Sequence, residues 1–162
     1  MRLEYANLHC SLKHCYAAVI NFIEVKQKIQ KLIKDYENDQ DRLIVLEKLL
    51  EQYNKVESIF DKITTIIESM YFKNKEVTVT EISKLVTALR IIRSKLENII
   101  NSIIKLCSIS ENDELIENAI LEDFRFLYGN IANVEMHLNY IFSDENEEWN
   151  AKRRSAWCTT RF

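Results

Sequence analysis

The stretch ISKLVTALRIIRSKLENIINSIIKL, residues 82–106, decides the fold of this chain. Its spacing, alternately three and four positions, places one apolar row along a single helical face and is typical of helices that pack lengthwise. The row comprises Ile82, Leu85, Leu89, Ile92, Leu96, Ile99, Ile103 and Leu106. Just before it, Thr78 and Glu81 have the spacing of a capping box, which satisfies two amide groups at a helix start. The stretch therefore predicts a long, packed helix over about 79–108.

Three other segments carry the same periodicity and predict helices over about 10–36, 39–73 and 111–143. Asn38 or Asp39 supplies an N-cap for the second of these helices, and the polar run at 110–113 supplies one for the last. The chain has one glycine, Gly129, and no proline, so it has few residues that favour tight turns. The composition therefore favours an all-α fold.

Each connection between the predicted helices is short, which forces neighbouring helices to run antiparallel. The prediction is an up-down-up-down antiparallel four-helix bundle that forms a single domain over 1–162, with the tail 144–162 packed on it. A second set of apolar residues lies outside the main rows, and we expect most of it in the core because bundle helices need wide apolar faces. The set comprises Val19, Ile20, Ile23, Ile44, Leu49, Ile59 and Ile66.

The net charge is -3 and no basic stripe stands out, which argues against nucleic acid as a partner. No apolar run reaches the roughly 18 residues of a bilayer span, so membrane insertion is not expected. Residues 1–7 lack the basic start and apolar run of a secretory signal, which keeps a cytoplasmic location open.

The four cysteines are Cys10, Cys15, Cys107 and Cys158, and their even number favours two disulfides in an oxidising compartment. The predicted helix directions put Cys107 about 30–40 Å from Cys10 and Cys15, so only the tail can reach it. We therefore expect the pairs Cys10–Cys15 and Cys107–Cys158, and a secreted protein. The alternative is that the cysteines are reduced and pack as small apolar residues inside the cell.

Two His-Cys pairs, His9-Cys10 and His14-Cys15, supply side chains that zinc favours, but their spacing matches no common zinc pattern. No Ser-His or Cys-His arrangement indicates a catalytic site, and no di-iron pattern occurs. We expect no metal, no cofactor and no enzymatic activity.

The tail is the expected binding segment, because tryptophan and arginine dominate binding hot spots. The candidate residues are Trp149, Lys152, Arg153, Arg154 and Trp157. In the alternative interpretation these tryptophans only pack the tail onto the bundle.

The sequence thus favours a non-enzymatic, disulfide-stabilised secreted protein that binds another protein. Its architecture resembles the cysteine-stapled helical domains of salivary proteins of blood-feeding insects and of secreted parasite effectors, which implies a host-directed role. An intracellular or viral helical adaptor with reduced cysteines is one alternative. A carrier of a small apolar ligand or lipid is another, because helical bundles can hold ligands between their helices.

Overall fold

The computed structural model describes residues 3–73, 76–107 and 113–142, with side chains at 5–73, 76–107 and 119–142. These ranges form the helices α1 (Leu3–Asp35), α2 (Gln40–Phe72), α3 (Val79–Cys107) and α4 (Asp113–Asn139) and a 3₁₀-helix, η1 (Tyr140–Phe142). The predicted cap at 110–112 and the tail 144–162 lie outside the described residues.

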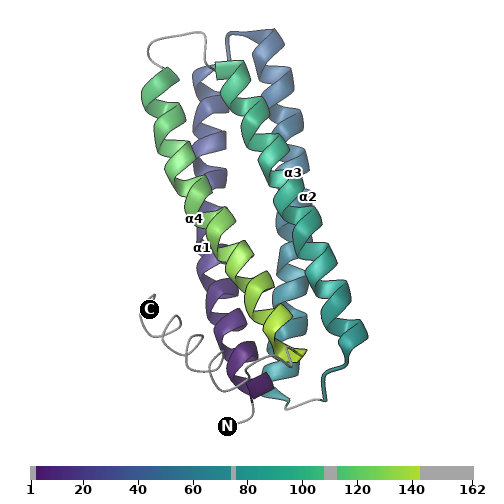
Figure 1. The fold of residues 1–162 in the computed structure, drawn as a ribbon. Helices are drawn as coiled ribbons and strands as arrows, with labels where there is room; N and C mark the ends of the chain where they lie inside the picture. Colours follow the sequence, from purple (N-terminus) through teal and green to yellow (C-terminus); the bar gives the residue numbers. More distant parts are fainter. Residues whose placement is uncertain (1–2, 74–75, 108–112, 143–162) are drawn as a thin grey trace.

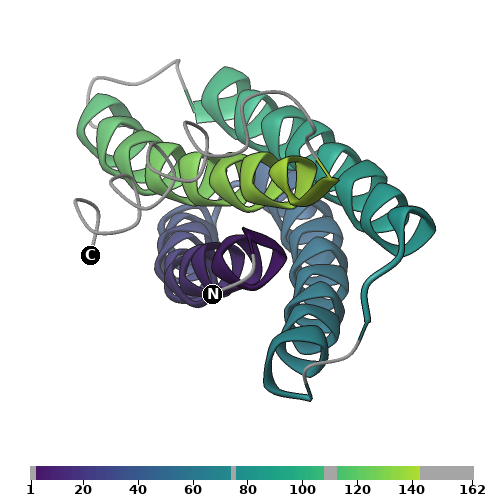
Figure 2. The ribbon, with the colours of Figure 1, turned by 60° about the horizontal axis from the view of Figure 1, so that its bottom comes forward.

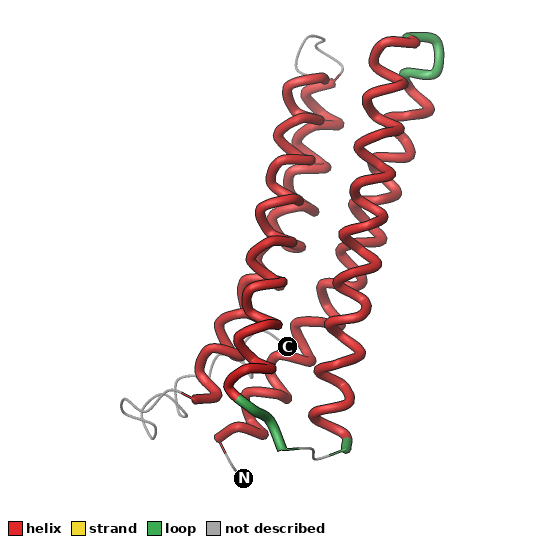
Figure 3. Tube along the Cα trace, turned by 90° about the vertical axis from the view of Figure 1, so that its right-hand side faces the viewer, coloured by secondary structure: helices red, strands yellow, loops and turns green. Residues whose placement is uncertain are grey.

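The helices form a four-helix bundle in which α1 lies beside α4, and α2 beside α3 (Figure 1). A view directed more nearly along the bundle axis shows that each helix has two neighbours (Figure 2). The turn between α1 and α2 lies at one end of the bundle and the connection between α2 and α3 at the other (Figure 3). The predicted up-down-up-down arrangement is confirmed. None of the described helices has the length and apolarity that a bilayer span requires.

Local capping explains where two of the helices begin. The Asp39 side chain accepts a hydrogen bond from the Arg42 amide at 3.4 Å and caps α2. Before α3, the Thr78 amide donates to the Glu81 carboxylate at 3.1 Å, and the Glu81 amide donates to the Thr78 hydroxyl at 3.2 Å. The predicted capping box is therefore confirmed.

Two helix ends differ from the prediction. Helix α1 begins at Leu3 and not near residue 10, because its first turns are held by packing: Leu8 is buried, and the Tyr5 ring stacks on Tyr71 of α2 at 4.6 Å between centroids. Helix α4 ends at Asn139, and the chain then tightens into the 3₁₀-turn of η1.

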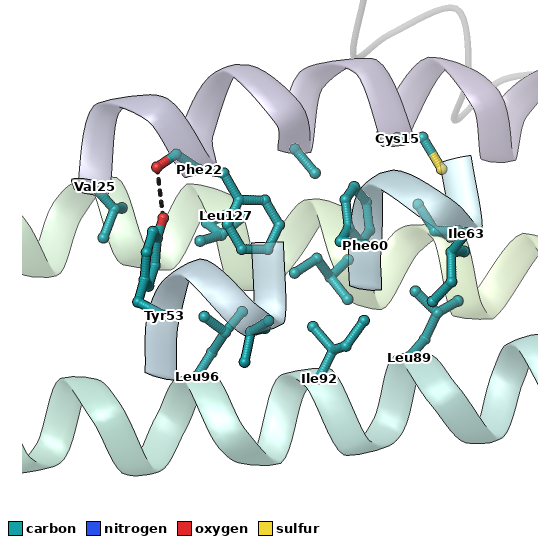
Figure 4. Close-up of a cluster of buried hydrophobic side chains, with 14 of the residues drawn as sticks. Cys15, Phe22, Val25, Tyr53, Phe60, Ile63, Leu89, Ile92, Leu96 and Leu127 are labelled. Carbon is teal, nitrogen blue, oxygen red and sulfur yellow. Dashed lines mark hydrogen bonds between the residues drawn. The ribbon is translucent and has the colours of Figure 1, made fainter. Parts of the chain in front are cut away.

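The predicted apolar rows of all four helices meet in one core (Figure 4). At its centre the Phe22 ring of α1 packs against Phe60 of α2, with 5.2 Å between ring centroids, and Leu89 and Ile92 of α3 lie on the opposite side. The Tyr53 hydroxyl donates a 2.6 Å hydrogen bond to the Phe22 carbonyl oxygen, so the one phenol in this layer is satisfied. This layer joins α1, α2 and α3 along the middle of the bundle.

Candidate functional site

The structure contradicts both predicted disulfide pairings, although Cys10 itself is disulfide-bonded. Cys15 and Cys107 are both buried thiols, and Cys158 lies outside the described residues. A Cys10–Cys15 bridge fails because α1 is continuous through both residues, and five residues of helix rise about 7.5 Å, beyond the reach of a disulfide. The Cys107–Cys158 bridge fails because the Cys107 thiol is enclosed by the core.

Cys15 has the surroundings of a packing residue. It lies at the α1–α2 contact with Thr64 and Glu68 nearby, and burial raises the pKa of its thiol to about 12. A thiol with so high a pKa is a poor nucleophile at neutral pH. Cys15 is therefore an apolar part of the core and not a reactive centre.

The two His-Cys pairs do not converge on one site. His9 Nδ1 lies 3.2 Å from the Tyr71 hydroxyl of α2, whereas His14 Nδ1 lies 3.1 Å from the Asn130 Oδ1 of α4. Among the described residues there is no cluster of three or more His, Cys, Asp or Glu side chains placed to hold a metal.

His14 and His137 are instead part of a polar layer between α1 and α4. Both are buried, and their rings stack with 5.5 Å between centroids. The Asn130 amide continues the layer by donating to Asn21 Oδ1 at 2.7 Å. Buried polar groups of this kind fix the register of two packed helices.

A second polar contact joins α3 and α4. The Glu135 carboxylate accepts a 2.7 Å hydrogen bond from Arg90 Nε and also pairs with Arg93. The Arg93 guanidinium in turn lies 5.5 Å from the centre of the Tyr128 ring. Because both arginines bind the same carboxylate, we assign this group a structural role.

The predicted binding residues Trp149, Lys152, Arg153, Arg154 and Trp157 lie outside the described residues. The described part of the chain offers a different surface. The expectation that most of the second apolar set is core is wrong, because only Leu49 is buried and Val19 is half-buried. The exposed members are Ile20, Ile23, Ile44, Ile59 and Ile66.

Ile59 and Ile66 border a surface groove between α2 and α3, which we call the α2–α3 groove. Its walls are two rows at heptad spacing, and two hollows of about 240 and 300 Å³ lie along it. The α2 row is Lys48, Gln52, Lys55, Ile59, Lys62, Ile66 and Ser69, and the α3 row is Glu81, Lys84, Ala88, Ile91, Lys95, Asn98 and Ser102. The floors of the hollows are apolar: Val56 and Ile99 in the first, Met70 and Leu85 in the second.

The two hollows establish which residues oppose each other across the groove. Lys55 lies near Lys95 in the first hollow, and Ile66 lies near Lys84 in the second. The same antiparallel register brings Ile59, which lines the first hollow, opposite Ile91. These two side chains are 39% and 51% exposed, so an apolar strip at the centre of the groove faces solvent.

No basic stripe was predicted from the sequence, but five lysines lie in the two rows of this groove. Acidic residues lie between these lysines in the sequence, but the helical repeat places them on other faces of the helix. Glu57 and Asp61, for example, lie at the opposite edge of α2, where Lys26 of α1 pairs with Glu57 and also acts on Asp61. The heptad spacing of Lys48, Lys55 and Lys62 is the signal that could have revealed the row.

Comparisons with protein-family models, curated proteins and solved structures found no match to this chain.

Proposed function

We propose that this protein is a non-enzymatic helical bundle that binds another protein through the α2–α3 groove. The observation that supports this proposal best is the exposed isoleucine row, Ile59 and Ile66 of α2 and Ile91 of α3, beside two hollows with apolar floors. Apolar groups gathered in a groove with a polar rim are typical of surfaces that take a partner helix.

The energy available from this row is modest. Burying a whole isoleucine side chain contributes roughly 1.5–3 kcal/mol, so covering the exposed half of three such residues contributes about 3 kcal/mol. Micromolar binding needs about 8 kcal/mol after the costs of association. A partner must therefore also fill the two hollows or use the polar side chains of the walls.

The cysteines do not favour one compartment over the other. Cys15 and Cys107 are buried thiols, as in reducing compartments, whereas Cys10 is disulfide-bonded, as in oxidising ones. An intracellular adaptor and a secreted, host-directed protein are therefore both candidates. A count of thiols in unreduced, denatured protein separates them: four for the adaptor, fewer for the secreted protein.

A photo-crosslinking residue placed at Ile59 tests the proposal in the cells that make the protein. The matched control is the same residue at Ile20, which is 58% exposed on α1 away from the groove. We expect the Ile59 probe to give one discrete protein adduct that an added Ile91→Glu substitution removes, with helical content unchanged by circular dichroism. Equal adducts from both probes, or an Ile59 adduct that survives Ile91→Glu, would contradict the proposal.

A further inference from the structure

The geometry points to a specific kind of partner: the α2–α3 groove takes an acidic amphipathic helix, which lies along it as a fifth helix. This inference rests on the proposed function and adds the chemistry of the partner.

The charge of the groove is opposite in sign to that of the whole chain. Its two rows hold Lys48, Lys55, Lys62, Lys84 and Lys95, whereas the chain carries a net charge of -3. The one acidic residue in the rows, Glu81, is at the end of the groove and accepts the capping hydrogen bond from the Thr78 amide. Positive potential is therefore concentrated along the groove, which attracts a negatively charged partner.

Most of these amino groups are open to a partner. Lys55 forms an ion pair with Glu51 at 3.6 Å, but both side chains are more than 70% exposed and such pairs exchange readily with solvent. For Lys62, Lys84 and Lys95, the described part of the structure contains no ion pair, and all three side chains are exposed.

The spacing of the rows matches a helix. Ile59 and Ile66 are one heptad apart and Ile91 opposes Ile59, so a partner with apolar residues at three- and four-residue spacing would continue the pattern of the bundle. Lysines flank this strip on both walls, where acidic residues at the flanking positions of a partner helix would meet them. From Lys48 to Ser69 the groove accommodates about six helical turns, or a partner segment of about 20 residues.

Other anionic partners fit less well. A bilayer is flat at this scale and would leave the two hollows unfilled, whereas the side chains of a helix can enter them. A second copy of the chain in a twofold contact would bring the same lysines against each other. The strip of isoleucines along the centre of the groove has no counterpart in the phosphate backbone of a nucleic acid.

The test uses the full chain and three helical peptides of about 20 residues. The peptides share leucines at the apolar heptad positions and differ only at the flanking positions, which are all Glu, all Gln or all Lys. Binding is measured by fluorescence anisotropy at low and high salt. Lys55→Glu/Lys95→Glu is the test variant, and Lys31→Glu/Lys34→Glu, which makes the same charge change at exposed residues of α1, is the matched control.

We expect the Glu peptide to bind at least about tenfold more tightly than the Gln peptide at low salt, and this preference to shrink as salt screens the charges. The test variant should lose the preference, because its groove rows are then close to neutral, while the control variant retains the original order. Circular dichroism of both variants verifies that the bundle is intact.

Three results would overturn the inference. If all three peptides bind equally well, the groove is apolar in character and the proposed function stands without the acidic partner. If no peptide binds but the Ile59 photo-adduct persists, the partner is not a helix of this kind. If vesicles of phosphatidylserine and phosphatidylcholine bind to the five lysines and the peptides do not, the surface recognises lipid. Loss of the photo-adduct itself would contradict the proposed function as well.

Discussion

Replacing Tyr53 with phenylalanine removes one hydroxyl group from the centre of the bundle. Tyr53 is 1% exposed, and its hydroxyl donates a 2.6 Å hydrogen bond to the Phe22 carbonyl oxygen of α1. The phenylalanine ring would occupy the same place, against Phe22 at 5.6 Å between ring centroids. The substitution therefore isolates one polar contact between α1 and α2 from the packing around it.

The expected loss of stability is about 1 kcal/mol. A buried neutral hydrogen bond contributes roughly 0.5–1.5 kcal/mol, and the larger penalty for an unsatisfied partner does not apply because the Phe22 carbonyl keeps its bond within the helix. For a chain of this size, the change lowers the melting temperature by about 2–4 °C. The cavity left by a single oxygen atom adds little to this loss of stability.

Urea denaturation followed by circular dichroism measures this change as a shift of the midpoint with an unchanged slope. Tyr16→Phe is the matched control, because Tyr16 is 44% exposed and its replacement should cost less than about 0.5 kcal/mol. Equal effects of the two substitutions, or no effect of Tyr53→Phe, would show that the buried hydrogen bond does not contribute as argued.

The same substitution has a predictable pH dependence. Burial, and secondarily the Glu57 carboxylate, raise the pKa of Tyr53 above its ordinary value of 10.0. Because the pKa of Tyr53 is higher in the folded state, its contribution to the free energy of unfolding is complete below about pH 10. This contribution is lost as the pH rises further, because the tyrosine of the unfolded chain ionises first. The phenylalanine variant has no such loss, so the stability difference between the two proteins should shrink above about pH 10.

Three further predictions concern the cysteines, a helix cap and an interhelical ion pair. Unreduced protein in denaturant should have at least two titratable thiols, Cys15 and Cys107, which react slowly in the native state because both are buried. Thr78→Ala should cost about 1 kcal/mol in urea denaturation, because it removes half of the capping box of α3. Glu135→Gln should cost about 1.5–3 kcal/mol, because two arginines lose a charged acceptor.

Each of these predictions has a control and a result that contradicts it. A thiol count of zero without reductant would restore the secreted, fully bridged protein. Thr80→Ala, an exposed threonine beyond the cap, should leave stability within about 0.5 kcal/mol, so equal losses at Thr78 and Thr80 would argue against the capping role. Glu51→Gln breaks the exposed pair with Lys55 and should cost less than about 1 kcal/mol, and a cost as large as that of Glu135→Gln would refute the assignment.

Local signals made the helices predictable. The Thr78–Glu81 box and Asp39 are short-range devices whose hydrogen bonds involve only neighbouring residues, so they formed where the sequence indicated. The row from Ile82 to Ile103 is buried throughout, because heptad spacing on a long helix leaves one face for the core.

The candidate site depended on tertiary geometry that periodicity does not specify. A second apolar row widens a helix face, but whether Ile59 and Ile66 end in the core or beside a groove depends on how α2 packs against α3. The predicted disulfide of Cys15 was wrong for a different reason. Cys15 continues the row of Ala18 and Phe22, so helical spacing already favoured a core thiol over the disulfide that the even count suggested.

Competition at the Ile59 probe tests directly whether the α2–α3 groove is where an acidic partner helix binds. Cells or extracts in which the probe forms its adduct receive an excess of the Glu peptide or of the Lys peptide before irradiation. We expect the Glu peptide to abolish the adduct and the Lys peptide to leave it unchanged. An adduct that persists at saturating Glu peptide would show that no acidic helix binds in this groove.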